Sequence, residues 1–303
     1  MIYLKEAQVR QALPIAECVN LMRTVFTRLA AGEAINQPRR RLILATRSAL
    51  HYMAGSDGLY FGAKIYSTNP GHGAHFLFLL YRAEDAALLA IIEANALGQI
   101  RTGAASGLAT SLLARPDART LAIIGSGFQA ETQLEAILAV APLERVRVWS
   151  RSREKREAFA RRASARHSIA VEAASSAEAA VRGADILVTA TNSGEPVVES
   201  AWIAPGTHIN AMGSNQARRR ELPADLVARA DLIAVDSIEQ SRMESGDLLL
   251  AFEEPDWQRV IELQAVVAGK CGRRDAGEIT LFKSNGLAVE DVIAAGWVYE
   301  HCT

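Results

Sequence analysis

A glycine-rich turn between an apolar strand and a helical segment has the clearest chemistry in this sequence. The run 121–124 is apolar, and Gly125-x-Gly127-x-x-Ala130 follows it directly. In such a turn the first glycine permits a tight bend, the second lets the backbone approach a pyrophosphate, and the small third residue lets the helix pack on the strand. The free N–H groups at the start of the helix then face the phosphates. The spacing and its context predict a dinucleotide-binding turn.

The end of the next expected strand, 145–149, bears on the choice between the two nicotinamide cofactors. An acidic residue there would bind the ribose 2′-hydroxyl of NAD and repel the 2′-phosphate of NADP. No acid is present, and hydroxyls and cations follow instead: Ser150, Arg151, Ser152 and Lys155. Arg151 can bind a phosphate through two hydrogen bonds and stack on adenine. We therefore predict NADP(H), with NAD(H) as the alternative; the competing interpretation is that these cations only solvate the following helix.

Two cations occur where an unpaired charge would be costly. Lys64 interrupts an otherwise apolar strand pattern at 60–66, and Arg101 precedes a segment of small residues that suggests burial. A buried charge needs a partner of opposite sign, and a guanidinium holds a carboxylate by two parallel hydrogen bonds. Both residues are therefore candidates for binding an anionic substrate. The competing interpretation of Lys64 is an edge-strand charge that faces solvent.

The chain has 303 residues, which suits two domains. From residue 121 short strands alternate with helices, and this pattern is typical of an α/β fold with a parallel sheet. We expect a Rossmann dinucleotide-binding domain at 116–284. A mixed α+β domain for substrate binding and dimerisation is expected at 1–115 plus 285–303, because the pattern changes again after Gly277.

In the first domain the apolar periodicity predicts short strands and helices in alternation. Strands are expected at 41–45 and 59–65, and a hairpin at 75–93. A tightly packed helix rich in alanine, serine and threonine is expected at 101–113, and the helix after the glycine turn is expected to begin at Glu131.

Composition and charge exclude several classes of function. Half of the residues are hydrophobic and the formal net charge is −1, so no global attraction to nucleic acid or to a membrane surface is expected. The three cysteines, Cys18, Cys271 and Cys302, are scattered without metal-binding spacing and are interpreted as free thiols of a reduced, cytoplasmic protein. No pattern of His, Cys and carboxylates suggests a metal site.

Together these motifs resemble the ornithine cyclodeaminase/mu-crystallin family along nearly the whole chain. The resemblance is carried by Gln37-Pro-Arg-Arg40, the glycine turn, and segments 62–65, 99–105, 206–214, 220–222, 235–237, 244–247 and 279–291. It implies a Rossmann domain, a nicotinamide cofactor, and a homodimer formed through the sheet of the first domain. The reaction is less narrowly implied, since the family includes cyclising deaminases, imine reductases and amino-acid dehydrogenases.

The resemblance also implies roles for individual residues. Arg40, Lys64 and Arg101 are expected to bind the substrate carboxylate. Arg40 is chosen among three consecutive arginines by its spacing within the Gln-Pro motif, because neighbours in a strand face opposite sides. Cofactor contacts are expected from Gly125, Ser126, Gly127, Phe128 and Gln129 of the turn, and from Thr102, Thr191, Asn192, Met212, Gly213, Ser214 and Ser284.

One position departs from the ornithine cyclodeaminase pattern. Those enzymes carry an aspartate where this chain has Asn215, which we also expect beside the substrate. An amide can form hydrogen bonds but cannot accept a proton at neutral pH, so it cannot act as a general base. Mu-crystallin-type ketimine reductases also lack this aspartate, and the similarity therefore points to their chemistry.

We therefore expect an NADPH-dependent reductase of a small α-imino acid. The substrate would be a cyclic ketimine such as 1-pyrroline-2-carboxylate or 1-piperideine-2-carboxylate, or an acyclic imine such as iminosuccinate. Two alternatives remain: an NAD-dependent ornithine cyclodeaminase, and a non-catalytic, crystallin-like protein that binds NADPH. His72 and His75 lie near Lys64 in the sequence, but they are interpreted as loop and strand residues because neither has an evident partner.

Overall fold

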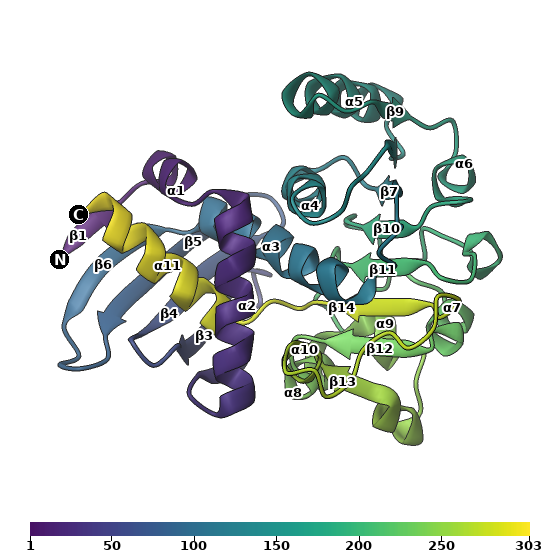
Figure 1. Cartoon of the computed structure of the whole chain (residues 1–303). Coiled ribbons are helices and arrows are strands. Elements are labelled where there is room, and N and C mark those ends of the chain that lie inside the picture. Colours follow the sequence, from purple (N-terminus) through teal and green to yellow (C-terminus); the bar gives the residue numbers. More distant parts are fainter. The chain divides into compact units, whose positions relative to one another are not determined.

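The computed structural model describes residues 1–303 and divides into two compact units (Figure 1). One unit consists of Met1–Ala104 and Gly286–Thr303, and the other of Ala105–Asn285. The division falls inside helix α3 (Asn95–Leu113), whereas the domain boundary expected from the sequence follows that helix at residue 115. No helix combines the length and the apolar composition needed to cross a membrane.

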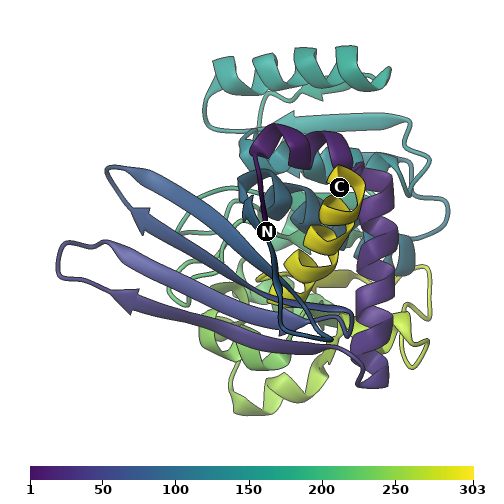
Figure 2. The same cartoon turned by 90° about the vertical axis from the view of Figure 1, so that its left-hand side faces the viewer.

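The first unit contains a six-stranded sheet with the order β1-β6-β5-β4-β3-β2 (Figure 2). Strands β2 to β6 form an antiparallel meander, and β1 pairs parallel with β6. The strands are β1 (Ile2–Leu4), β2 (Ile35–Ile43), β3 (Ala49–Ser56), β4 (Tyr60–Asn69), β5 (Gly73–Arg82) and β6 (Leu88–Glu93).

The sequence predicted the hairpin β5–β6 and strand β4 but not the first part of this sheet. Strand β2 begins six residues before the expected strand at 41–45, and β3 was not expected at all. Pro38 and three consecutive arginines hide the alternation of β2. A proline is tolerated there because β2 is an edge strand, with only β3 as a neighbour.

Alternation divides the side chains of this sheet between two faces. Met53, Lys64, Phe78 and Ile92 are paired across adjacent strands and are all buried. Helix α11 (Ala288–Cys302) packs on this face, and α1 (Glu6–Ala12) and α2 (Ile15–Ala31) pack on α11. The burial of Lys64 thus follows from its register in β4 rather than from its polarity.

The second unit contains eight parallel strands in the order β13-β12-β14-β11-β10-β7-β8-β9. The strands are β7 (Thr120–Ile124), β8 (Arg145–Trp149), β9 (Val171–Ala173), β10 (Ile186–Thr189), β11 (His208–Ala211), β12 (Leu232–Val235), β13 (Val260–Glu262) and β14 (Thr280–Lys283). Its helices are α4 (Phe128–Leu138), α5 (Arg153–His167), α6 (Ala177–Val181), α7 (Ala224–Arg229), α8 (Ile238–Glu244), α9 (Gly246–Leu249) and α10 (Leu263–Val267), with short 3₁₀ turns at Ser200–Trp202 and Glu254–Arg259. The alternation of helices with parallel strands confirms the predicted α/β class.

Strand β14 lies between β11 and β12 in the sheet, and the second unit ends at Asn285. Two details of the predicted elements were wrong. Helix α4 begins at Phe128, directly after the glycine turn, instead of at Glu131. Helix α3 begins at Asn95 instead of Arg101, since the Glu6 carboxylate accepts hydrogen bonds from the Asn95 and Ala96 N–H groups at 2.8 and 2.6 Å. That cap comes from a residue far away in the sequence, so no local pattern could indicate it.

Candidate active site

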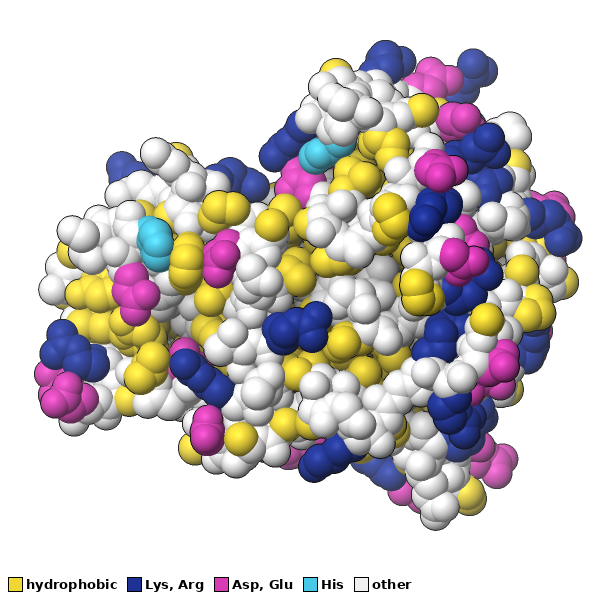
Figure 3. Space-filling view, in the orientation of Figure 1, with side chains coloured by type: hydrophobic (Ala, Val, Ile, Leu, Met, Phe, Trp, Pro, Cys, Tyr) yellow, Lys and Arg dark blue, Asp and Glu magenta, His cyan; other side chains and the backbone are white.

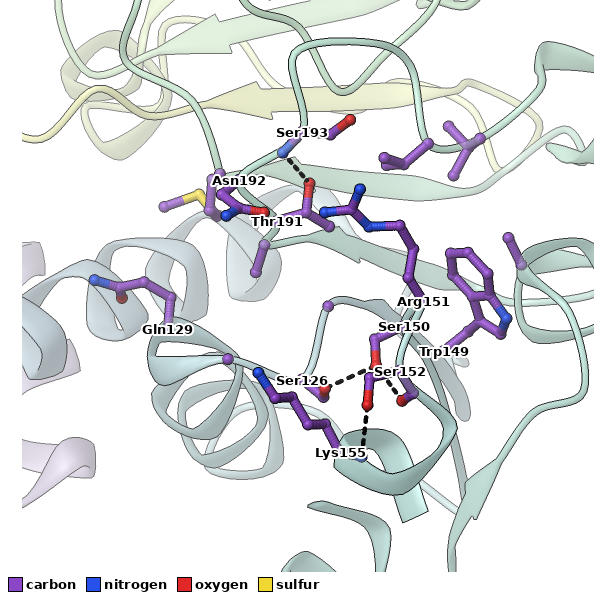
Figure 4. Close-up of a pocket in the computed structure, with 18 of the residues that line it drawn as sticks. Ser126, Gln129, Trp149, Ser150, Arg151, Ser152, Lys155, Thr191, Asn192 and Ser193 are labelled. Atoms are coloured by element: carbon purple, nitrogen blue, oxygen red, sulfur yellow. Dashed lines mark hydrogen bonds between the residues drawn. The ribbon is translucent and has the colours of Figure 1, made fainter. Parts of the chain in front are cut away.

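A cavity of about 840 Å³ lies in the second unit where β7, β8 and β10 end (Figure 4). The order of the sheet changes direction at β7, whose neighbours are β8 and β10. In open α/β sheets ligands bind at such a point, beyond the carboxyl ends of the strands.

Most of the predicted cofactor residues line this cavity: Gly125, Ser126, Gly127, Phe128, Gln129, Ser150, Arg151, Ser152, Lys155, Thr191, Asn192, Met212 and Gly213. Thr102, Ser214 and Ser284 are not among its lining residues. Their hydroxyl groups donate to Gly98 O at 2.7 Å, Arg219 O at 3.2 Å and Asp236 Oδ2 at 3.0 Å. The sequence reasoning missed Trp149, Ala177, Ala190, Ser193, Glu199, Trp202 and the run Pro196–Val198. The missed residues are mostly in loops, where no periodicity marks them.

The glycine turn has the geometry that a bound dinucleotide requires. Gly125 has a φ of +120°, and a Cβ there would lie 2.3 Å from the Ala190 carbonyl oxygen. A Cβ on Gly127 would meet nothing within 4 Å, so the missing side chain leaves open space at the lining of the cavity. No side chain caps helix α4, which leaves its first N–H groups to a ligand. The turn therefore fits a pyrophosphate.

Hydroxyl and basic side chains surround the end of β8. The Ser126 and Ser150 hydroxyls share a hydrogen bond of 2.8 Å, and the Ser152 hydroxyl accepts from the Lys155 N–H at 3.2 Å and thereby caps helix α5. The side chains of Arg151 and Lys155 project into the cavity (Figure 4). This part of the lining is therefore positively charged and contains no carboxylate at the end of the strand.

A cluster of buried charges lies in the first unit, between the sheet and α11. Lys64 Nζ lies 2.8 Å from Asp291 Oδ1. Arg101 Nε lies 3.2 Å from the same oxygen, and Arg101 Nη1 lies 2.7 Å from Glu290 Oε2. Lys64, Arg101, Glu290 and Asp291 are each at most 6% exposed. The two predicted cations are thus brought together, and the two carboxylates that orient them were not expected from the sequence.

The third predicted cation, Arg40, is not part of this buried cluster. Arg40 pairs in register with Tyr52 on the opposite face of the sheet and is exposed. Its neighbour Arg39 is buried, with a hydrogen bond of 3.3 Å to the Gly286 carbonyl oxygen. The register of β2 shifts between Gln37 and Arg40, and this irregularity decides which arginine faces inward. The placement of Arg40 in the cluster is therefore corrected to Arg39.

Burial and neighbouring charges set the ionisation of the two central cations. Burial lowers the pKa of Lys64 to about 8, although Asp291 opposes the shift; Arg101 and Arg39 add to the lowering. Burial also disfavours the charged form of Arg101, but Asp291 and Glu290 outweigh it and raise the pKa of Arg101 above its ordinary value. Lys64 is therefore the titratable cation of the cluster near neutral pH.

Two glycines leave the space that these cations occupy. A Cβ on Gly98 would lie 2.6 Å from Lys64 Nζ, and a Cβ on Gly286, whose φ is +79°, would lie 2.4 Å from Arg101 Nη1. Both glycines therefore take part in positioning the cluster.

Aromatic side chains extend the same face of the sheet beside Lys64. His51 stacks on Tyr66 with ring centroids 4.3 Å apart, and Tyr66 stacks on Phe76 at 4.7 Å. Burial, followed by the charges of Arg41 and Arg39, lowers the pKa of His51 to about 4, so this ring is neutral. In contrast, His72 and His75 are exposed. Asn215 is half-buried and is not among the residues that line the cavity.

Comparison with known proteins places these features in a family. A model of the ornithine cyclodeaminase/mu-crystallin family matches residues 1–303. The chain is 42% identical over 216 residues to a Delta(1)-pyrroline-2-carboxylate reductase of Bacillus cereus (strain ZK / E33L), covering 70% of this chain and 66% of that relative. It is 37% identical over 231 residues to the ketimine reductase mu-crystallin of Mus musculus, covering 76% of this chain and 70% of that one.

A solved structure is similar over the full length. Thermococcus litoralis Delta(1)-pyrroline-2-carboxylate reductase, in complex with NADH and L-proline, matches with a TM-score of 0.95 and 34% identity. The match covers 100% of this chain and 97% of that one. The curated bacterial relative above is matched over slightly less than two thirds of its length.

Proposed function

Because this chain belongs to the ornithine cyclodeaminase/mu-crystallin family, we propose that it reduces the C=N bond of a small α-imino acid to the L-amino acid. The observation that carries the proposal is the buried cluster of Lys64, Arg101 and Arg39. These three cations accompany two buried carboxylates, Glu290 and Asp291, which gives the cluster a formal charge of +1. Since a buried charge is stabilised by an opposite one, the cluster suits a monoanionic carboxylate.

The reaction needs few groups beyond this cluster. Arg101 and Arg39 hold the substrate carboxylate, and their own carboxylate and carbonyl partners keep them oriented. A ketimine nitrogen is basic enough for the substrate to enter the site as an iminium ion. When the substrate enters without this proton, Lys64 supplies it to the nitrogen. The nicotinamide, when bound, supplies the hydride to the carbon beside the carboxylate. The C=N bond thereby becomes a CH–NH unit with one hydride and one proton added.

Asn215 supports reduction over the two neighbouring reactions of the family. Both cyclodeamination of ornithine and oxidative deamination require a base that accepts a proton from an amine or from water. A carboxamide at residue 215 cannot do so. Release of ammonia from ornithine is accordingly not part of the proposed activity.

The positive end of β8 supports NADPH as the preferred cofactor. Arg151 and Lys155 line the cavity, and the acid that would bind a ribose 2′-hydroxyl is missing. The glycine turn would hold the pyrophosphate, and the loops that contain Thr191, Asn192 and Met212 would border the nicotinamide.

Replacement of Arg151 by alanine is expected to raise the KM for NADPH about ten- to hundredfold and to leave the KM for NADH nearly unchanged. The reason is the loss of a charge-assisted hydrogen bond to the 2′-phosphate. Steady-state kinetics with both cofactors provide the measurement. Arg153→Ala is the matched control, because Arg153 is exposed, pairs with Glu157 at 2.6 Å and does not line the cavity. Equal losses with NADPH and NADH would contradict the assignment.

The uncovered face of the first unit's sheet supports a homodimer. Leu42, Leu50, Tyr52 and Leu77 lie on this face and are 40 to 56% exposed. Figure 3 shows the side of this unit on which helix α11 lies, and hydrophobic side chains gather there too, at its left-hand edge. Extended apolar patches of this kind mark interfaces.

The double change Leu42→Asp and Tyr52→Asp is expected to convert a dimer into monomers, as measured by sedimentation analysis. A monomeric wild-type protein would contradict the proposed dimer.

The proposed activity is tested with purified protein, NADPH or NADH, and three imino acids: 1-pyrroline-2-carboxylate, 1-piperideine-2-carboxylate and iminosuccinate. Oxidation of the cofactor and formation of the L-amino acid are expected with at least one of them. Tight cofactor binding without turnover of any imine would favour a binding protein instead. Ammonia from ornithine without net change of cofactor would favour a lyase.

A further inference from the structure

We infer that Glu221 is a positioning residue that holds together the two loops expected to border the nicotinamide. The inference rests on the proposed use of a nicotinamide cofactor and concerns residues of the second unit only. The first loop, Thr191–Ser193, follows β10, and the second, Met212–Ser214, follows β11. Nothing in the local sequence indicates a link between Glu221 and either loop.

Four donors from these loops and from β10 converge on the Glu221 carboxylate. Oε1 accepts from the Thr191 N–H at 2.7 Å and from the Thr191 hydroxyl at 2.6 Å. Oε2 accepts from the Gly213 N–H at 2.7 Å and from the Thr189 hydroxyl at 2.8 Å. Glu221 is fully buried, so water does not replace these bonds. One side chain thus joins the ends of two adjacent strands at the edge of the sheet that bears the cavity.

The glycine at position 213 is explained by this carboxylate. A Cβ on Gly213 would lie 2.4 Å from Glu221 Oε1 and 2.4 Å from the Thr191 carbonyl oxygen. Only a residue without a side chain therefore permits the second loop to approach both Glu221 and the first loop. Gly213 and Thr191 also line the cavity, so the contact is transmitted directly to its wall.

A second buried carboxylate holds Glu221 in place. Asp247 Oδ1 accepts from the backbone N–H groups of Glu221 and Leu222 at 2.6 and 3.0 Å. Its other oxygen lies 3.1 Å from Nζ of Lys283 on β14, and that amine also donates to the Ser214 carbonyl oxygen. Asp247 and Lys283 are fully buried. The lysine compensates negative charge in the network and extends the support to the end of the second loop.

Glu221→Gln separates the charge of this carboxylate from its shape. An amide offers only one oxygen, so its NH₂ group must replace either Oε1 or Oε2. The hydroxyls of Thr189 and Thr191 can rotate away, but the backbone N–H of either Thr191 or Gly213 must then face another donor. One of the two loops therefore loses its tether, whichever way the amide is turned.

The experiment measures dissociation constants for NADPH and NADH by fluorescence titration, together with thermal unfolding and imine turnover. For Glu221→Gln, Kd for both cofactors is expected to rise about tenfold or more, as one buried donor is left unsatisfied. The KM for the imino acid is expected to stay within about twofold of the wild-type value, because the predicted carboxylate-binding cations belong to the other unit.

Asp185→Asn is the matched control. Asp185 Oδ2 receives two backbone N–H groups, from Arg119 and Thr120 at 2.9 Å each, and Oδ1 pairs with Arg115, but Asp185 precedes β10 at the opposite edge of the sheet. In the asparagine variant the NH₂ group must face either Arg115 or the two N–H groups, so a loss of Tm with unchanged cofactor affinity is expected there. If Glu221→Gln does not fold, Glu221→Asp keeps the charge, withdraws the carboxylate by one methylene group, and should weaken cofactor binding similarly.

Two results separate this inference from the proposed function. Unchanged Kd in the Glu221 variants, or an equal rise in Asp185→Asn, would overturn the positioning role while leaving the reductase intact. Failure of the wild-type protein to bind either cofactor would overturn both.

Discussion

Replacement of Lys64 by methionine is expected to lower kcat/KM for the imino acid about 10²–10⁴-fold, the range typical for loss of a positioned proton donor. The protein is expected to remain folded. Burial already disfavours the charged form of Lys64, and an apolar side chain of similar length can fill the space between Gly98 and Phe76. Asp291 keeps its contact with Arg101. Steady-state kinetics and thermal unfolding of the two proteins provide the measurement.

Two controls distinguish loss of chemistry from loss of structure. The affinity for NADPH is expected to be unchanged in Lys64→Met, since the cavity at the glycine turn is built from residues of the second unit. Arg28→Met breaks another ion pair of the first unit, the 3.1 Å contact with buried Asp57, and should reduce stability without a comparable kinetic effect. Near-normal turnover by Lys64→Met would remove Lys64 from the mechanism.

The activity is also expected to fall at alkaline pH because of the same lysine. The pKa of Lys64 is lowered from 10.5 to about 8, so the amine is charged below pH 8 and loses its proton above it. The charged form both attracts the substrate carboxylate and supplies a proton. We therefore expect kcat/KM to decrease about tenfold per pH unit above this value, as for a single essential ionisation. A profile of kcat/KM from pH 6 to 10 provides the measurement.

Asp291→Asn tests whether Lys64 causes this decrease in kcat/KM, the alkaline limb of the pH profile. The Asp291 carboxylate raises the pKa of Lys64 against the effect of burial, so its loss is expected to move the limb to lower pH. Titration of the imino acid itself is common to both proteins, and a difference between the profiles therefore belongs to the enzyme. An identical midpoint in wild type and variant would assign the limb to substrate or cofactor.

The lowered pKa of Lys64 also affects stability, in the direction opposite to its effect on activity. Between pH 8 and 10.5 the folded protein has largely lost the Lys64 proton, whereas the unfolded chain still binds it. Because the unfolded state binds more protons in this window, the contribution of Lys64 to the free energy of unfolding rises with pH. Activity and the lysine's contribution to stability should thus change in opposite directions across the window.

The local sequence was sufficient to predict those features of this protein that depend on residues close together in the chain. The glycine turn could be identified because a strand, a tight bend and a helix follow one another within a few residues, and most of its predicted contacts do line the cavity. Lys64 and Arg101 could be singled out because a cation in an apolar pattern is costly wherever the chain folds. The parallel α/β class followed from alternating periodicities.

Only the tertiary structure decided the features that depend on register and on distant partners. A shift in the pairing of β2 with β3 turns Arg39 inward and Arg40 outward, and no spacing in the sequence encodes it. Glu290 and Asp291 reach Arg101 and Lys64 across about two hundred residues. Glu221 likewise meets Thr191 and Gly213 only when two parallel strands end side by side. Periodicity reports which face a residue occupies within its own element, whereas the partner on that face is set by how the elements pack.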